Sequence, residues 1–288
     1  MTLRWFAVAT VLSGAVFAHG AETVDLDYRL RADRDLTVDQ VQENVTAIRV
    51  IEDRGLVAKA ASNGSRFPGT YHVVNRQRFR YTTGAAQPDG SFPATLSILS
   101  RRVNLRLASG EEQAVTGQPD MDNFVFKAVI DPQGRVLQPS VEAGGVDAGN
   151  HEAIKAVMAS VLEQATRIEP LRVEQGQAAQ QVVNMKLPLP GLTELDLRIT
   201  ASNRLIAITD GVAKVEMVYV MEFGIPQGPV RLTASGTGGG TLLYDIAGRM
   251  ARSIESNTLM TIVAEVPDGT LEFQMNTRQT QQMQDAVR

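Results

Sequence analysis

Residue types that often perform chemistry in proteins are sparse in this sequence. His72 lies in a strand-like run and His151 stands at the start of a helical pattern, far away in the chain. Neither belongs to an HExxH motif or to another spacing that is typical of metal ligands. The chain has no cysteine, which excludes thiolate metal sites, cysteine nucleophiles and disulfides. We therefore expect no metal ion and no cofactor.

Clustered oxygen atoms at Asp120, Asp122 and Asn123 are of the kind that Ca²⁺ prefers. Phe124 and Val125 follow, where an EF-hand loop needs a further ligand and a glycine, so the segment is interpreted as a solvated turn. The sequence also lacks a GxSxG elbow and an SxxK motif. No motif requires catalysis, and a hydrolase without a recognisable motif remains an alternative.

A glycine-rich segment, 236–240, has the composition of a phosphate-binding loop. Such a loop follows a strand, opens a helix and carries GK[ST] or GxGxxG spacing. Here the strand-like run TLLYD follows, and no lysine is nearby. We interpret the segment as a tight connection or a β-bulge.

Arg76, Arg78 and Arg80 alternate along a strand-like segment and would share one face of a strand. One interpretation is a patch that contacts an anion, such as a lipid headgroup or an acidic glycan. The other is a charged outer face that protects a sheet edge from aggregation.

Methionines concentrate in the second half of the chain, within strand-like segments. Methionine is flexible and suits adaptable apolar grooves, but it also fills cores. The candidates for lining an apolar groove are Met185, Met217, Met221, Met260 and Met275.

Turn sequences that contain Asp and Gly separate apolar, β-branched stretches along the chain. These turns are 52–55, 131–134, 210–211, 245–248 and 267–269. Both residues tolerate turn conformations, so each turn predicts a β-hairpin, and the first predicts a strand over 56–60. Alternating apolar residues at 24–30, 195–199 and 271–275 predict half-buried strands.

One segment, near 151–167, has apolar residues at helical spacing instead. Asn150 can cap this amphipathic helix and Pro170 ends it. Residues 37–48 could also form a helical face. We favour a strand from about Asn44, because the first turn needs a partner strand.

These patterns predict a mainly β (α+β) fold. We expect a large twisted antiparallel meander of about ten or more strands, as a curved sheet or two lobes, with one helix packed on it. A single β-rich domain would cover 21–280, with any two lobes joined near 143–150. The polar tail 281–288 is expected to fray.

The first residues of the chain have the pattern of a signal peptide, assigned to 1–20. Arg4 precedes an apolar run, 6–18, which is too short for a bilayer of about 30 Å. We expect cleavage near 18–21, release into the bacterial periplasm or the medium, and no transmembrane anchor after cleavage. A buried N-terminal helix or strand is the alternative. The net charge of −4 is spread along the chain, which argues against nucleic-acid partners.

An ordered series of segments runs through the second half of the chain. It consists of VFKAVIDPQGRVLQ, the helix HEAIKAVMASVLEQ, IEPLRVEQGQ and GGTLLYDIAGRMARSIESNTLM. This series, over about residues 120–280, resembles a group of uncharacterised bacterial exported β-rich proteins, a domain of unknown function. Alanines follow Gln177 where that group has a tryptophan. The resemblance implies a β-rich exported protein and supplies no catalytic residues.

These expectations favour an exported, soluble, non-catalytic protein of the bacterial envelope. A curved sheet with a helix across its mouth can enclose an apolar groove, so the partner would be an apolar small molecule or an envelope protein. The alternative is a structural or assembly factor that offers a sheet edge or face to other envelope components. A continuous apolar cavity above about 300 Å³ would favour the first hypothesis.

Overall fold

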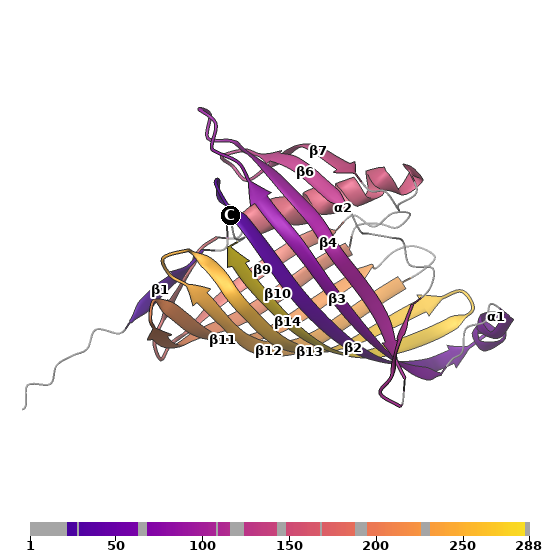
Figure 1. Ribbon diagram of the computed structural model, residues 1–288. Coiled ribbons are helices and arrows are strands. Elements are labelled where there is room, and N and C mark those ends of the chain that lie inside the picture. The colour runs from indigo at the N-terminus through magenta and orange to yellow at the C-terminus, as the bar shows by residue number, and fades with distance from the viewer. Residues whose placement is uncertain are drawn as a thin grey trace, which may run out of the picture.

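Most of the chain forms one large, strongly curved antiparallel sheet in the computed structural model (Figure 1). The structure describes residues 22–27, 29–62, 68–107, 109–115, 124–142, 148–167, 169–187, 195–225 and 231–285. The expected signal peptide, the cluster at 120–123 and most of the segment expected to join two lobes lie outside the described residues. The predicted mainly β fold is confirmed.

Twelve strands make up the sheet, in the order β7-β6-β4-β3-β2-β14-β13-β12-β11-β10-β9 with β5 beside β4. They are β2 (Asp35–Asp53), β3 (Gly69–Thr83), β4 (Phe92–Arg106), β5 (Glu112–Ala114), β6 (Val125–Ile130), β7 (Val136–Glu142), β9 (Ala178–Leu187), β10 (Leu195–Thr209), β11 (Val212–Ile225), β12 (Arg231–Asp245), β13 (Met250–Val266) and β14 (Gly269–Asp285). The first strand of this sheet, β2, pairs with the last, β14. This pairing joins the two halves of the chain into one sheet.

Four of the predicted Asp–Gly turns connect paired strands, as expected. They join β6 to β7, β10 to β11, β12 to β13 and β13 to β14. At the β10–β11 turn both Asp210 and Gly211 have positive φ, 50° and 74°. This backbone is what a two-residue type I′ hairpin turn requires, and Asp and Gly tolerate it best.

The first turn, 52–55, does not lead into a strand, so the prediction for 56–60 is wrong. Helix α1 (Leu56–Ser62) follows instead. The Asp53 carboxylate accepts hydrogen bonds from the amides of Gly55 and Val57, 2.9 and 3.2 Å away, and so caps the helix. The partners of β2 are β3 and β14.

Strand β2 starts at Asp35, well before the expected start near Asn44, and the helical alternative for 37–48 is wrong. Long strands on both sides supply hydrogen bonds to its backbone, which outweighs the helical spacing of its valines. The same pairing corrects the expected frayed tail, because residues 281–285 continue β14 opposite 36–40. Met283 contributes an apolar side chain there, opposite Val38.

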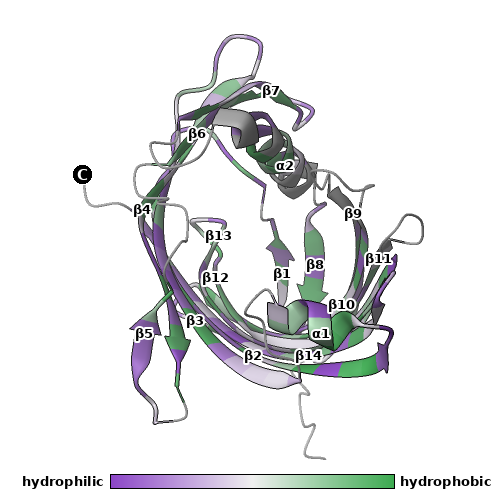
Figure 2. Cartoon of the chain, turned by 90° about the vertical axis from the view of Figure 1, so that its right-hand side faces the viewer, coloured by the Kyte–Doolittle hydropathy of each residue, from purple (hydrophilic) through white to green (hydrophobic). Residues whose placement is uncertain are grey.

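Helix α2 (Ala148–Arg167) confirms the predicted amphipathic helix. It contacts β6 and β7 at one edge of the sheet and β9 at the other, and so lies across the gap between the two edges (Figure 2). On its apolar face, Ile154, Met158 and Leu162 pack against a cluster that includes Phe124 and Phe126, both 1% exposed. The helix is therefore anchored by core packing at the β6 edge.

A second, two-stranded sheet of β1 (Thr23–Leu26) and β8 (Leu171–Glu174) lies inside the curve of the large sheet (Figure 2). Val24, Leu26 and Val173 pack against β10 to β13, where Leu242 and Tyr244 are also buried. The strand expected over 24–30 ends at Leu26, because the chain leaves β8 there. This small sheet fills one end of the concave face.

The glycine-rich segment 236–240 lies inside β12, so its interpretation as a connection or bulge is wrong. Its alternate members face the concave side, where other atoms occupy the space of a side chain. The ring of Tyr219 lies over Gly238, and the carbonyl oxygen of Glu255 stands where a side chain on Gly240 would be. Glycine is needed here because β11 and β13 approach β12 closely in the curved sheet.

Candidate functional site

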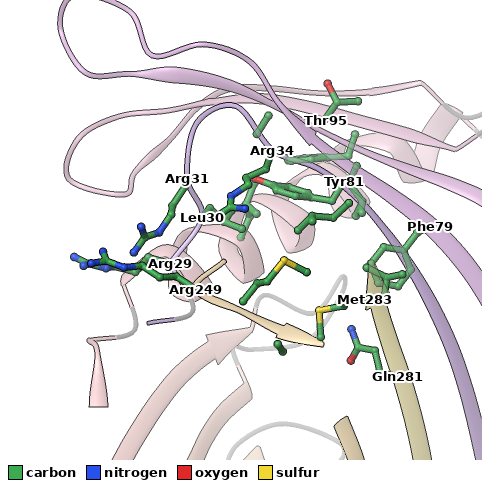
Figure 3. A pocket seen from close by; sticks show the side chains of 18 of the residues that line it. Arg29, Leu30, Arg31, Arg34, Phe79, Tyr81, Thr95, Arg249, Gln281 and Met283 are labelled. Atoms are coloured by element: carbon green, nitrogen blue, oxygen red, sulfur yellow. The ribbon is translucent and has the colours of Figure 1, made fainter. Parts of the chain in front are cut away.

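A cavity of about 530 Å³ lies on the concave side of the sheet, beneath α2 (Figure 3). Its size falls within the range of small-molecule sites, about 300–1,000 Å³. The lining residues come from the loop after β1, from α2 and from β2, β3, β4, β6, β13 and β14. They are Arg29, Leu30, Arg31, Arg34, Leu36, Val38, Phe79, Tyr81, Ala94, Thr95, Leu96, Phe126, Met158, Leu162, Arg249, Met250, Ala251, Ile254, Gln281 and Met283.

The walls of the cavity are apolar because side chains on paired strands align in rows across the sheet. One row contains Phe126, Leu96, Tyr81 and Leu36, which are register partners on β6, β4, β3 and β2. Another row joins Phe79, Val38 and Met283 on β3, β2 and β14. Met158 and Leu162 cover the cavity from α2. Alternation within each strand directs these side chains to the concave face.

Arginines are the charged residues of the lining. Figure 3 shows Arg29, Arg31 and Arg249 gathered at one end of the cavity, with Phe79 and Met283 toward the other. Arg29 and Arg249 are exposed, whereas Phe79 is half-buried. The arginines therefore mark the end of the cavity that meets solvent.

Asp27 positions two of these arginines. Its carboxylate, 6% exposed, accepts from Nε and Nη2 of Arg29 at 2.9 and 3.0 Å and from Nη2 of Arg31 at 2.6 Å. The hydrogen bonds from Arg29 hold the pKa of the Asp27 carboxyl well below its usual range, against the opposing effect of burial. Asp27 is therefore ionised at neutral pH and neutralises one of the two guanidinium charges.

The guanidinium of Arg34 contacts the turn that bears Arg249. Nη2 of Arg34 donates to the backbone carbonyl oxygen of Gly248, and Arg249 is the next residue. Within the part of the chain that the structure describes, neither Arg34 nor Arg249 has a carboxylate partner. Their two positive charges at the cavity mouth therefore have no carboxylate counter-charge among the described residues.

Tyr81 is the polar exception among the buried walls. Tyr81 is 9% exposed, and its hydroxyl has no hydrogen-bond partner among the described residues. Figure 3 shows the hydroxyl directed toward Arg34. Burial raises the pKa of Tyr81, so the hydroxyl keeps its proton and remains a donor.

This arrangement suits binding of an amphipathic molecule. Apolar walls can hold a hydrocarbon chain, while guanidinium groups and a phenol at one end can contact polar atoms. The described residues contain no cluster of three or more His, Asp or Glu side chains that could hold a metal ion.

The three arginines predicted as an anion patch lie on β3 and alternate with cavity residues such as Phe79 and Tyr81, so they face the outer side. Each forms an ion pair with a carboxylate. Arg76 pairs with Glu112 at 2.6 Å, Arg78 with Asp39 at 3.5 Å and Arg80 with Asp35 at 2.5 Å. Their charges are matched locally, and the anion patch stays a prediction.

The predicted methionine groove lies on the concave face but away from the cavity. Met221, Met260 and Met275 occupy one row across β11, β13 and β14, and Met217 packs against the cluster under the small sheet. Met185 lies in β9, and its side chain is outside the described residues. The methionines that line the cavity are Met158, Met250 and Met283, so the predicted groove is untested.

The outer face carries a second hollow of about 570 Å³, bordered by β2 and β11 to β14. Val220, Leu259 and Val45 belong to one row across these strands, and Leu259 is 55% exposed. No arginine, lysine, aspartate or glutamate of the described residues lines this hollow. Its lining mixes this apolar surface with neutral polar residues, namely Ser235, Thr237, Thr261, Gln274 and Asn276.

The sequence-based reasoning missed the residues that form the cavity mouth. A local signal existed, because Arg29, Arg31 and Arg34 stand close together directly after a short strand. Arg249 carried no such signal, since only the β12–β13 turn brings it beside Arg34. Tyr81 was hidden among the alternating residues of β3.

No protein-family model matches the chain, and no curated protein shows significant sequence similarity to it. Neither helix in the part of the chain that the structure describes is long and apolar enough to cross a membrane.

Proposed function

We propose that this chain is a non-catalytic binding protein of the bacterial envelope that holds the hydrocarbon part of a lipid-like molecule in the cavity beneath α2. The observation that carries the proposal is the cavity itself, about 530 Å³ with apolar walls. Packed protein interiors contain few voids larger than a water molecule. A cavity of this size between a sheet and a helix supports a ligand site, because small-molecule sites have volumes in this range.

The energetics favour a hydrocarbon occupant. Aliphatic groups from Leu36, Val38, Leu96 and Leu162 line the cavity. Water molecules in the cavity would find no hydrogen-bond partners on these walls. Each methylene group transferred from water to such walls gains about 0.8 kcal/mol. An acyl chain therefore gains binding free energy in proportion to its buried length.

The cellular setting of the proposal comes from the leader sequence and the resemblance described above. A chain exported without cysteines meets membranes and their lipids outside the cytoplasm. A protein that shields an apolar chain from water would serve there as a carrier or a sensor of lipid-like molecules.

The test uses the neutral fluorophore N-phenyl-1-naphthylamine and a variant that fills the cavity. Leu162→Trp places an indole in the cavity, whereas Leu99→Trp makes the same change at an exposed site, 49% accessible, in β4. We expect the fluorophore to bind the unchanged protein and Leu99→Trp equally, and Leu162→Trp about tenfold more weakly or not at all. Equal binding by Leu162→Trp, with its fold retained by circular dichroism, would overturn the proposal.

A second measurement uses the protein as the cell makes it. Native mass spectrometry of protein purified from its own compartment, followed by organic extraction, should reveal a bound lipid-like mass. The Leu162→Trp protein purified in parallel should lose that mass, while Leu99→Trp should keep it.

A further inference from the structure

We propose that the ligand carries an anionic headgroup, a carboxylate or a phosphate, which Arg34 and Arg249 bind at the cavity mouth while Tyr81 donates a hydrogen bond to it from inside. This inference rests on the proposed function, because it assumes that the apolar part of the ligand occupies the cavity. It adds the chemical class of the headgroup and the residues that recognise it.

The charge of the cavity lining favours an anionic headgroup. Four arginines line the cavity, namely Arg29, Arg31, Arg34 and Arg249, and no lining residue of the described chain is acidic. The Asp27 carboxylate, just outside the lining, pairs with both Arg29 and Arg31 and neutralises one of their two charges. A positive excess therefore remains at the mouth, beside apolar walls that screen it poorly. An anion is the ligand group that this site stabilises most.

The positions of Arg34 and Arg249 also suit an anionic headgroup. Nη2 of Arg34 donates to the carbonyl oxygen of Gly248, which holds its guanidinium next to the turn that bears Arg249. The backbone of Arg249 has a φ of 50°, which is a left-handed conformation within this turn. Each guanidinium has five N–H donors in a planar fork, and Arg34 uses one of them in this contact. The remaining donors suit the two or three oxygen atoms of a carboxylate or phosphate.

Tyr81 supplies an independent observation that points to the ligand. Its hydroxyl is buried, directed toward Arg34, and without a partner among the described residues. A buried hydroxyl without a hydrogen bond costs free energy, and native structures rarely keep one without a reason. An oxygen atom of the headgroup placed between Arg34 and Tyr81 would satisfy it.

The experiment compares ligands that share one alkyl chain and differ in the headgroup. Dodecanoate, dodecyl phosphate, dodecanol and dodecyltrimethylammonium each displace N-phenyl-1-naphthylamine from the protein. We expect both anions to act at concentrations about tenfold or more below that of dodecanol, and the cation to be weakest. Added salt should narrow the difference, because it screens the arginines at the mouth. Whichever anion binds more tightly identifies the source as a fatty acid or as a phosphate-bearing lipid.

Matched variants assign the effect to the named residues. Arg34→Gln/Arg249→Gln should weaken the binding of both anions about tenfold or more. It should weaken the binding of dodecanol and of the fluorophore by less than about twofold. The control, Arg198→Gln/Arg278→Gln, removes the same charge from exposed positions on the outer face. It should change neither the binding of the anions nor that of dodecanol and the fluorophore. Arg249→Gln alone should weaken the anions by less than the double variant. This single change affects an exposed side chain that has no ion pair with the described residues, so it tests the inference even where the double variant folds poorly.

Two outcomes would overturn the inference and leave the proposed function standing. One is equal displacement by dodecanol and dodecanoate in the unchanged protein, and the other is an unchanged anion preference in Arg249→Gln and in the double variant. Failure of the proposed function looks different, because no alkyl ligand would then displace the fluorophore and Leu162→Trp would bind it normally.

Discussion

Tyr244 and Asp27 exchange two hydrogen bonds across 217 residues of sequence. The amide of Asp27 donates to the phenol oxygen at 3.0 Å, and the hydroxyl donates to the carbonyl oxygen of Asp27 at 3.2 Å. Tyr244 is fully buried in β12, so this contact fixes the end of β1 against the large sheet. The Asp27 side chain then holds Arg29 and Arg31 at the cavity mouth.

Tyr244→Phe should therefore destabilise the protein and loosen the mouth. The ring still fills its place in the core, but the amide and carbonyl of Asp27 lose a buried partner, which costs about 1–3 kcal/mol. Urea unfolding, followed by circular dichroism, measures this loss. Tyr219→Phe is the matched control. Among the described residues, the hydroxyl of Tyr219 bonds to the part-buried hydroxyl of Thr258, a partner that water can replace. Equal midpoints for the two variants would contradict the role given to Tyr244.

Tyr81→Phe should behave in the opposite way in the absence of ligand. The hydroxyl of Tyr81 has no partner among the described residues, so its removal should leave the free energy of unfolding unchanged or raise it by up to about 1 kcal/mol. The same change should weaken dodecanoate binding severalfold, because a donor to the headgroup is lost. A ligand-free protein that loses more than about 1 kcal/mol would show that the hydroxyl already has a protein or water partner.

Asp27 should contribute to stability in a pH-dependent way. Its folded-state pKa is lowered by Arg29, so its contribution is fully present above the unfolded-state pKa near 3.9 and is lost as pH falls below it. Asp27→Asn should cost about 2 kcal/mol at pH 7, and this difference should shrink progressively as pH falls from about 5 toward the lowered folded-state pKa. Urea titrations at several pH values measure it. Asp25→Asn, a change at an exposed position in β1, should show neither effect.

The sequence was sufficient for the fold where local signals decide structure. Asp210 and Gly211 need a positive φ that few other residues tolerate, so their hairpin could be predicted without tertiary information. The amphipathic helix was predicted for the same reason, because its apolar residues repeat at helical spacing. Local signals failed at Asp53, which looked like part of a hairpin turn but caps α1.

The site could not be predicted, because it depends on contacts between distant segments. Arg34 meets Gly248 across 214 residues, and nothing near either residue indicates the other. Sequence patterns placed the methionines in strands, but only the curvature of the sheet and the position of α2 decide where a face encloses a cavity. The arginines of β3 illustrate the same limit, since their carboxylate partners Asp35, Asp39 and Glu112 come from other strands and were not visible in the local pattern.

Thr166 should anchor the C-terminal end of α2, the helix that covers the cavity. Its hydroxyl lies within hydrogen-bond distance of the carbonyl oxygens of Gly134, in the β6–β7 turn, and Glu163. Thr166→Val keeps the shape and loses these bonds, so it should cost about 1 kcal/mol. Amide hydrogen exchange should increase in α2 while β12 and β13 stay protected. Thr166→Ser, which keeps the hydroxyl, is the control and should exchange more like the unchanged protein.

Gly238 should be required by its neighbour on β11 rather than by its own backbone. A Cβ at this position would overlap the ring of Tyr219, whose hydroxyl is 2.7 Å from that of Thr258. Gly238→Ala should therefore destabilise the protein by about 1–3 kcal/mol, as overpacking does.

The coupling between the two positions tests this cause. In a Tyr219→Ala background the ring is absent, and Gly238→Ala should become neutral or stabilising, because alanine restricts the unfolded chain more than glycine does. Gly240→Ala provides the contrast. The atom that it meets is the backbone carbonyl oxygen of Glu255, so Tyr219→Ala should not relieve its cost. A double-mutant cycle from urea unfolding measures both pairs, and equal coupling energies would show that strand curvature, not the Tyr219 ring, selects glycine at position 238.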